Sequence, residues 1–302
     1  MTQPQTAGIR PLLAHVYEPH RVSFPCYVQP KLNGVRALYQ AGHFQSRDLQ
    51  PFPVGLLDHL AQPLLQLFKS DIVLDGELYV HGWPLQRILG AVTPVRQEAN
   101  EDTKLVEYHV FDRVDYGQGF EKRFVEDIYI KGPICTNVFA VETQRVKDEA
   151  DANYFYSAFV SLGYEGMMYR INDCPYTIPK QRKPPSQKGF LSDKNNRVWH
   201  LLKRKNWQDE EFICLGLQEG EGKYRGMVGA LVCDKGPCDL YITPVGQRIE
   251  AGRFSVSSGL SDQQRIDIWA NPSLAVSHQI KVKFLTYSID GIPQNPTIEA
   301  IL

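Results

Sequence analysis

The sequence lacks several features that would assign a protein to a class at once. No run approaches the roughly 18 apolar residues that a membrane-spanning helix needs, and the polar start, Met1 to Arg10, has no apolar signal core. The six cysteines include no C-x-x-C pair, and no Cys/His pair follows Cys233 and Cys238, so we expect no zinc site. We therefore expect reduced cysteines in a soluble intracellular protein, located in the cytoplasm (of the host cell if the source is viral).

Two further absences limit how the chain could hold a nucleotide or a nucleic acid. It has neither a G-x-x-x-x-G-K-[ST] phosphate loop nor a G-x-G-x-x-G fingerprint, and Gly220 to Lys223 is better interpreted as a turn. Its formal charge is only −1, so bulk positive charge cannot attract nucleic acid. Contacts with such a partner must come from local patches.

What is present indicates an α+β protein of two domains. The chain has 302 residues, of which 43% are hydrophobic, enough for two cores. Periodicity and breakers predict, in the first part, strands at Cys26–Gln29, Val35–Tyr39, Ile72–Val80 (interrupted at Asp75-Gly76), Leu105–Val114, Met167–Tyr169 and Trp199–Lys205, a tight connection at Pro30–Gly34, and helices at Gly55–Phe68 (kinked or shortened by Pro63) and Lys147–Leu162 (ended by Gly163).

The pattern changes after Trp207, where short strand-like runs alternate with glycine-rich turns. The predicted strands are Phe212–Leu217, Ala230–Cys233, Leu240–Thr243, Arg253–Val256 and Gln279–Tyr287, with one helix near Ser261–Trp269. Five or so short strands and one helix are typical of a small β-barrel such as an OB-fold. We therefore predict a first domain at residues 1–207 and an OB-fold domain at residues 208–302.

A candidate nucleophile lies at Lys31, in the run Lys31 to Arg36. A lysine followed three residues later by glycine is a weak pattern and is often a surface turn. Its place between two apolar strands favours a cleft position. A nucleophilic lysine must lose a proton, which desolvation or a nearby cation such as Arg36 can promote.

Carboxylates occur within two other apolar runs. Asp75 and Glu77 interrupt one strand, and Glu165 enters another between Tyr164 and Gly166. Each could lie in an exposed turn, but acids in apolar strands usually need a partner. A ribose or a divalent metal ion would provide one.

A possible stacking ring and a pair of cations complete the set. Phe111 lies in the run Glu107 to Asp112, where a core position is the commoner outcome for an aromatic residue. Lys203 and Lys205 point to the same face of a strand, an arrangement that suits a phosphate. In this order, the residues suggest phosphoryl or nucleotidyl transfer with a divalent metal ion.

Taken together, these motifs resemble those of the covalent nucleotidyltransferase superfamily, and within it the small phage-type ATP-dependent DNA ligases. The motifs that carry the resemblance are, in order, Lys31–Arg36, Ser46-Arg47, Asp75–Leu78, Tyr108–Asp112, Glu165–Arg170 and Leu202–Lys205. Glu219–Ala230 and Phe254–Arg265 resemble the ligase OB-domain. The resemblance implies an adenylyltransferase domain with ATP-grasp-like antiparallel sheets and helices, followed by an OB-fold.

The resemblance also implies roles for individual residues. Lys31 would attack the α-phosphate of ATP, and the AMP would then pass to the 5′-phosphate at a DNA nick before sealing. The implied ATP contacts are Gln29 and Pro30 at the adenine edge, Phe111 on its face, Glu77 at the ribose, Arg36 and Arg47 at ribose or phosphate oxygens, and Lys203 and Lys205 at the α-phosphate. Glu165, with Glu77, would bind Mg²⁺ or Mn²⁺.

Nicked double-stranded DNA is the expected partner, bound by a monomer without membrane contact. The basic residues that we expect to touch the duplex are Arg47, Lys180, Arg182, Lys183 and Lys188, with more basic residues up to Lys205.

Two positions depart from the family pattern. Asn33 stands where many members have Asp, and we expect activity to survive. No Arg or Lys follows Lys283, although the family's OB-domain normally ends in a basic motif that contacts ATP phosphates. On this ground we expect lysine adenylylation to be slow relative to sealing.

Other functions remain open at this point. An RNA ligase or an mRNA-capping guanylyltransferase would share the lysine-adduct chemistry, and a non-catalytic nucleic-acid-binding protein could keep a degenerate site. The nucleotide that labels the protein would separate them.

Overall fold

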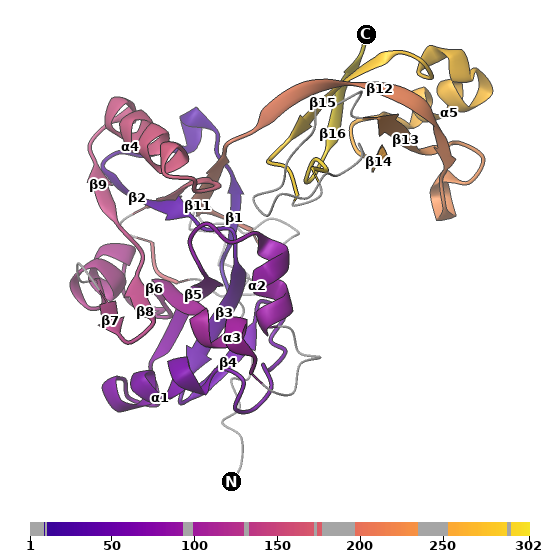
Figure 1. Ribbon diagram of the computed structural model, residues 1–302. Coiled ribbons are helices and arrows are strands. Elements are labelled where there is room, and N and C mark those ends of the chain that lie inside the picture. The colour runs from indigo at the N-terminus through magenta and orange to yellow at the C-terminus, as the bar shows by residue number, and fades with distance from the viewer. Residues whose placement is uncertain are drawn as a thin grey trace. The chain divides into compact units, whose positions relative to one another are not determined.

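The computed structural model describes residues 9, 11–92, 99–129, 133–171, 174–176, 197–234, 253–288 and 291–302. The chain divides into two compact units, Met1–Lys205 and Asn206–Leu302 (Figure 1). Several sequence predictions concern residues outside the described ranges, namely those for Lys180, Arg182, Lys183, Lys188, Lys194, Cys238 and the strand Leu240–Thr243. No helix in the described ranges is long and apolar enough to cross a membrane.

The first unit contains two sheets. The six-stranded sheet has the order β4-β3-β5-β6-β8-β7 and is antiparallel except for the parallel pair β6–β8. Its strands are β3 (Val35–Gln40), β4 (His43–Ser46), β5 (Val73–Tyr79), β6 (Glu107–Arg113), β7 (Pro133–Cys135) and β8 (Val138–Ala140). The five-stranded sheet has the order β1-β11-β10-β2-β9, with β1 and β11 parallel. Its strands are β1 (Leu13–Val16), β2 (Cys26–Lys31), β9 (Gln144–Val146), β10 (Gly166–Arg170) and β11 (Arg197–Lys205).

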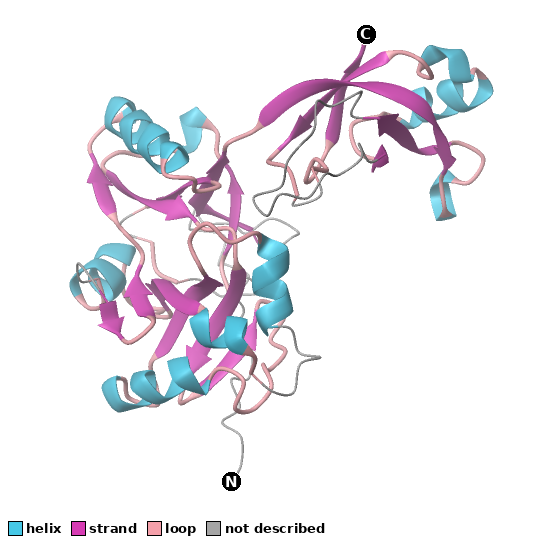
Figure 2. Cartoon of the chain, in the orientation of Figure 1, coloured by secondary structure: helices cyan, strands magenta, loops and turns pink. Residues whose placement is uncertain are grey.

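In the described part of this unit, four α-helices, a 3₁₀ turn and a π-helix accompany the sheets (Figure 2). They are α1 (Asp58–Leu67), α2 (Leu85–Val92), α3 (Glu101–Leu105), α4 (Glu149–Ser161), a 3₁₀ turn at Pro19–Arg21 and a π-helix at Glu121–Glu126. The Asp148 side chain caps the start of α4 by accepting from Asp151 N, and Gly163 follows its end with φ +87°. The predicted helix near residues 147–162 is confirmed.

Both sheets of this unit pack against apolar clusters. Leu60 and Leu64 of α1 and Ile88 of α2 pack with strand residues of the six-stranded sheet. A separate cluster joins Phe159 of α4 to Val28 of the five-stranded sheet. Burial of these apolar faces against helices is what fixes the strands that carry the polar residues discussed below.

Several predicted boundaries were wrong, each for a local reason. The helix predicted from Gly55 begins at Asp58, because Gly55 has φ +83°, and it continues through Pro63 to Leu67. The Pro30–Gly34 connection is shorter, because Lys31 still pairs with Gly166 of β10.

The Asp75-Gly76 step does not interrupt its strand. β5 runs unbroken, and its register against β6 shifts between these two residues, as in a β-bulge. The next predicted strand starts at Glu107, because Glu101–Leu105 form α3 under a capping box of Asn100 and Thr103.

The second unit is an antiparallel sheet with one α-helix. The strand order is β14-β13-β12-β15-β16, and hydrogen bonds between these described strands leave the sheet open rather than closed into a barrel. The elements are β12 (Gln208–Glu219), β13 (Val228–Asp234), β14 (Arg253–Val256), α5 (Asp262–Ala270), β15 (Gln279–Phe284) and β16 (Thr297–Ile301), with 3₁₀ turns at Gly222–Tyr224 and Pro272–Leu274. The helix predicted near Ser261–Trp269 is confirmed as α5, which starts under a capping box of Ser261 and Gln264, whereas β16 was not predicted.

Candidate active site

Lys31 is the last residue of β2 and lies in a charged cluster built by three neighbouring strands. The backbone N–H of Glu165 donates to the Lys31 carbonyl oxygen over 3.0 Å, and Gly166 pairs with both Lys31 and Lys205. This register places the side chain of Glu165 between two ammonium groups. Lys31 Nζ donates to Oε2 of Glu165, and Lys205 Nζ lies 2.9 Å from Oε1.

Gly166 makes this close approach of strands possible. Its φ is +147°, and a Cβ atom there would lie 2.1 Å from the carbonyl oxygen of Arg204. Any other residue would push β10 away from β11. The glycine after Glu165 is therefore a geometric requirement of the charged cluster.

The cluster changes the pKa values of two of its members. Burial alone would raise the pKa of Glu165, but Lys31 and Lys205 outweigh burial and hold the pKa below its usual value. Burial, with the nearby cations Arg197 and Lys205, lowers the pKa of Lys203 to about 8. The site thus combines a firmly ionised carboxylate with an ammonium group that titrates near neutral pH.

A cavity of about 590 Å³ opens beside Lys31 within the first unit. Eight of the predicted ATP-site residues line it: Gln29, Pro30, Lys31, Arg36, Arg47, Glu77, Phe111 and Lys203. Glu165 is connected to the cavity through its ion pair with Lys31, and Lys205 is connected through its ion pair with Glu165. Residues that are up to 174 positions apart in sequence therefore share one cleft, although their individual roles stay predictions.

Arg36 lies in the cleft, but its charge is already paired. It donates from Nε to Oδ1 of Asp75 over 2.9 Å and from Nη2 to Oδ2 over 2.5 Å, and its Nη1 bonds the Leu12 carbonyl oxygen. Burial would lower the pKa of Arg36, yet Asp75 raises it above the ordinary value. Arg36 is therefore an ion-paired cation and not a free one, and its effect on Lys31 stays a prediction.

Glu77 of β5 is partly buried on the wall of the cleft that Lys31 also lines. Burial raises its pKa to about 7, and this effect outweighs the opposing influence of Lys31 and Arg36. Gly34 packs against it so closely that a Cβ atom there would lie 2.8 Å from Cγ of Glu77 and 2.3 Å from the Leu78 carbonyl oxygen. The glycine of the Lys31–Arg36 motif thus leaves room for Glu77.

Phe111 and Gln29 form another part of the cleft wall. The Phe111 ring centroid lies 5.2 Å from Cζ of both Arg36 and Arg170. Gln29 is buried, and its Nε2 donates to the Phe111 carbonyl oxygen over 3.1 Å and to Oγ1 of Thr143 over 2.9 Å. The Gln29 side chain is therefore fully engaged inside the protein.

Sequence reasoning assigned no place in the cleft to several residues that line it, including Met168, Arg170, Arg197 and Leu201. Strand alternation could have identified them, because Met168 and Arg170 share a face of β10, and Leu201 and Lys203 share a face of β11. The sequence indicated that Asp75 needs a partner but did not identify Arg36 as that partner, and it gave no sign that Asp112 pairs with Arg123 and Arg170.

Two carboxylates could serve a divalent cation at this site. In the described ranges no group of three or more His, Cys, Asp or Glu side chains is arranged to hold a metal ion. Glu77 and Glu165 both interact with Lys31. Mg²⁺ usually keeps several waters and takes one or two carboxylates together with substrate phosphates, so this pair fits such an ion.

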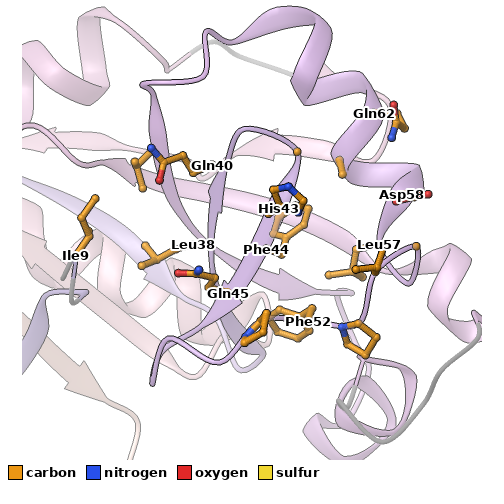
Figure 3. A pocket seen from close by; sticks show the side chains of 17 residues that line it. Ile9, Leu38, Gln40, His43, Phe44, Gln45, Phe52, Leu57, Asp58 and Gln62 are labelled. Atoms are coloured by element: carbon orange, nitrogen blue, oxygen red, sulfur yellow. The ribbon is translucent and has the colours of Figure 1, made fainter. Parts of the chain in front are cut away.

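A second cavity, of about 280 Å³, lies between the β3–β4 hairpin and α1 (Figure 3). Its wall combines apolar residues such as Leu38, Phe44 and Leu57 with polar ones such as Gln40 and Asp58, and no Lys or Arg is among the described residues that line it. It is therefore poorly suited to a nucleoside triphosphate, and the Lys31 cleft is the better candidate.

Comparison with protein families agrees with both units. A family model described as an ATP dependent DNA ligase domain matches residues 11–184, and a DNA ligase OB-like domain matches residues 219–301. The DNA ligase of African swine fever virus is 31% identical over 215 residues, which cover 67% of this chain and 46% of the viral protein. A DNA ligase of Haemophilus influenzae is 24% identical over 258 residues, covering 84% of this chain and 80% of that protein. The chain spans about half the length of the viral relatives it matches.

Solved structures support the fold. A structure from a study of DNA binding with a minimal scaffold in Lig E DNA ligases matches with a TM-score of 0.71 and 20% identity, over 97% of this chain and 99% of that one. The structure named Pmar-Lig_PreS3 matches with a TM-score of 0.74 and 19% identity, over 97% and 67% of the two chains. The predicted adenylyltransferase and OB-fold architecture is confirmed. With a family model that covers more than half of its length, this chain belongs to the ATP-dependent DNA ligase family.

Proposed function

We propose that the protein is an ATP-dependent DNA ligase that seals 5′-phosphate/3′-hydroxyl nicks in duplex DNA through a lysine–AMP intermediate. One observation carries the proposal: Lys31, Glu165 and Lys205 form a single ion-paired cluster at the edge of a nucleotide-sized cleft that Lys203 also lines. Three ammonium groups close together repel one another, so their clustering at Lys31 favours a site that binds an anion such as a phosphate.

In the first step the neutral amine of Lys31 attacks the α-phosphorus of ATP. A nitrogen–phosphorus bond forms, the bond to pyrophosphate breaks, and Nζ loses a proton. Lys203 and Lys205 would hold the α-phosphate oxygens and offset the charge that develops on them. Glu165 would orient Lys31 before the attack.

The remaining steps return Lys31 to its starting state. An oxygen of the 5′-phosphate attacks the adenylate phosphorus, and Lys31 leaves and regains its proton. The 3′-hydroxyl then attacks the 5′-phosphate, which forms the phosphodiester bond and releases AMP. Phe111 would stack on adenine and Glu77 would bind the ribose throughout, so that the nucleotide keeps its place while its phosphate bonds change.

Glu165 and Glu77 would hold a divalent cation, Mg²⁺ or Mn²⁺. When bound, such an ion supplies positive charge to the phosphate oxygens. The chain's own contribution is to place both carboxylates near Lys31 and to keep Glu165 ionised through Lys31 and Lys205.

DNA would be held by phosphate contacts at the rim of the cleft. In the described ranges Arg47 is the predicted DNA contact, and 61% of its side chain is exposed. We propose that Arg47, with the basic cluster Lys180, Arg182, Lys183 and Lys188, binds the duplex backbone. Replacement of these residues should weaken nick binding and flatten its salt dependence.

Covalent labelling tests the function directly. The protein is mixed with Mg²⁺ and ATP or GTP labelled at the α-phosphate, then denatured and examined for bound label. We expect label from ATP, lost in Lys31→Ala and kept in the control Lys104→Ala, an exposed lysine paired with Glu101. Label from GTP would instead indicate a capping guanylyltransferase, and no label from either would indicate a non-catalytic binder.

The nucleic acid is identified in a second assay with matched nicked duplexes. Sealing of nicked DNA supports the proposal. Sealing of nicked RNA alone would indicate an RNA ligase.

A further inference from the structure

Behind the Lys31 cleft, one buried carboxylate holds two buried arginines. Asp112 accepts from Arg123 at both oxygens, over 2.7 Å from Nε and 3.0 Å from Nη2. Arg170 Nη1 donates to Oδ2 of the same carboxylate over 2.6 Å. All three side chains are at most 5% exposed. Burying three charged groups costs desolvation free energy, which only close and well-oriented pairing offsets.

The two arginines occupy different places. Arg123 comes from the π-helix, and its Nη1 also donates to the carbonyl oxygens of Cys174 and Gln118, so it is tied into the protein interior. It does not line the cleft. Arg170 comes from β10 and does line it, so Asp112 connects an anchor to a cleft residue.

Arg170 contacts both parts of the wall that Phe111 and Gln29 form. Its Nε donates to Oε1 of Gln29 over 2.5 Å, and its Cζ lies 5.2 Å from the centroid of the Phe111 ring. Arg170 therefore restrains Phe111 in two ways. Its guanidinium group lies over the ring directly. It also acts on the Phe111 backbone through Gln29, whose Nε2 donates to the Phe111 carbonyl oxygen.

The charges of this group do not cancel. Two guanidinium groups share one carboxylate, so the group carries one net positive charge. Burial lowers the pKa of Arg170, and nearby Arg123 lowers it further, against the opposing effect of Asp112. A surplus cation is tolerated more easily beside a site that takes an anion.

We propose that Arg170 is a positioning residue for the nucleotide base: anchored by Asp112 and Arg123, it fixes the Phe111 ring and the Gln29 amide in the orientation that the base requires. The inference rests on the proposed function, since it assumes that Phe111 stacks on adenine. Arg123 does not reach the cleft, and the proposal has it affect nucleotide affinity by anchoring Asp112, which holds Arg170.

The shared carboxylate makes the idea testable without loss of the fold. In Arg170→Met the bidentate pair of Asp112 and Arg123 remains, and in Arg123→Met the pair of Asp112 and Arg170 remains, so neither variant leaves Asp112 alone. Arg113→Met is the matched control, because Arg113 follows Asp112 on β6 but pairs with Asp115 and Asp127, away from the cleft.

The measurement is the rate of lysine adenylylation over a range of ATP concentrations, with thermal melting to verify folding. For Arg170→Met we expect half-saturation at about tenfold or more ATP with little change in the maximal rate, as expected for loss of one charge-assisted hydrogen bond. Arg123→Met should show a smaller shift in the same direction, and Arg113→Met none.

Two further arms separate positioning from plain charge. Inhibition by inorganic tripolyphosphate, which has no base, should be nearly unchanged in Arg170→Met. Arg170→Lys keeps the charge but has a single donor nitrogen, whereas Arg170 donates to Gln29 from Nε and to Asp112 from Nη1, so its half-saturation should be intermediate.

The outcomes are distinct. Equal weakening of ATP and tripolyphosphate, or wild-type behaviour of Arg170→Lys, would overturn the positioning role. If Arg170→Met does not fold, Arg170→Lys decides alone. If the wild-type protein forms no ATP adduct, the proposed function fails. If it forms the adduct and Arg170→Met behaves like wild type, only this inference fails.

Discussion

Lys205 Nζ lies 2.9 Å from Oε1 of Glu165, the carboxylate whose other oxygen accepts a hydrogen bond from Lys31. Glu165 therefore separates two ammonium groups that would otherwise repel each other. It also fixes where the Lys31 amine points before any nucleotide arrives.

Glu165→Gln should slow lysine adenylylation by about 100-fold or more. The change leaves Lys31 and Lys205 close together without an anion and removes a carboxylate proposed to hold the divalent cation. Single-turnover labelling with ATP measures the rate. Glu101→Gln, which removes an exposed acid paired with Lys104, is the control, and similar rates in the two variants would argue against a special place for Glu165.

The affinity for ATP should fall as the pH rises through the pKa of Lys203. That pKa is lowered to about 8, so Lys203 is mostly charged at about pH 7 and mostly neutral at about pH 9. Loss of the charge removes a phosphate contact. Lys203→Arg stays charged over this range, so its half-saturating ATP concentration should change much less with pH. Parallel profiles for the two proteins would contradict the prediction.

Replacing Glu77 should stabilise the fold while impairing nucleotide binding. Its pKa is about 7 in the folded protein against an ordinary value of 4.5, so folding favours the protonated form. The destabilisation is absent below about pH 4.5, grows as the pH rises to about 7, and is then complete. Glu77→Gln should therefore raise the free energy of unfolding by about 1–3 kcal/mol at pH 8 and hardly at all at pH 4.5. Denaturant titrations at both pH values provide the test, and equal gains at both would disprove it.

Two glycines should respond to alanine in opposite ways. Gly34→Ala would place Cβ 2.3 Å from the Leu78 carbonyl oxygen, and we expect a loss of about 3 kcal/mol in unfolding free energy together with slower adenylylation. Gly90 lies within α2 with no atom near its missing Cβ, so Gly90→Ala should gain about 0.5–1 kcal/mol. Thermal melts of both variants check the contrast, and a neutral Gly34→Ala would refute the steric argument.

Cys214 and Cys233 in the second unit should form a disulfide under oxidation. Cys214 of β12 lies directly opposite Cys233 of β13. The backbone N–H and carbonyl groups of Cys214 bond His278 and Ser277 rather than Cys233, so the two cysteines form a non-hydrogen-bonded pair. Side chains are closest in pairs of this kind. A hydrogen bond between the thiols lowers the pKa of Cys214 to about 7.

The reaction with diamide would remove one hydrogen from each thiol, form the sulfur–sulfur bond and reduce the diazene to a hydrazine. Both thiols are buried, so the rate should follow opening of this unit. Peptide mapping should find the 214–233 link, with Cys233→Ser as the control. Linkage through other cysteines would contradict the pairing.

The sequence predicted the charged residues of the cleft better than the buried residues that hold them in place. Lys31, Glu77, Glu165 and Lys203 could be singled out because charged residues in apolar strands are unusual and because their order resembles a known family. Their convergence in one cleft depends on strand register, and a glycine such as Gly166 hints at that register only after the neighbouring strand is known.

The buried ion pairs could not be predicted in this way. Arg36 reads as an available cation until Asp75, 39 residues later, is seen to hold it. Asp112 lies in a predicted strand and Arg123 in a π-helix that was not predicted, so no local pattern indicated that the two pair in the interior. Pairing of this kind is a property of the tertiary structure, whereas the helix that ends before Gly163 follows a local pattern and was predicted.

The parallel pairing of β1 with β11 has a consequence for biosynthesis. β11 lies inside the five-stranded sheet, between β1 and β10, yet it is the last strand of its unit to leave the ribosome. A nascent chain that ends before Arg197 presents β10 with an open edge and leaves β1 without its neighbour. Closure over so long a stretch of chain slows folding. The charged cluster around Lys31 can therefore assemble only after the whole unit has been synthesised, and until then the exposed edge of β10 is a natural target for chaperones or for aggregation.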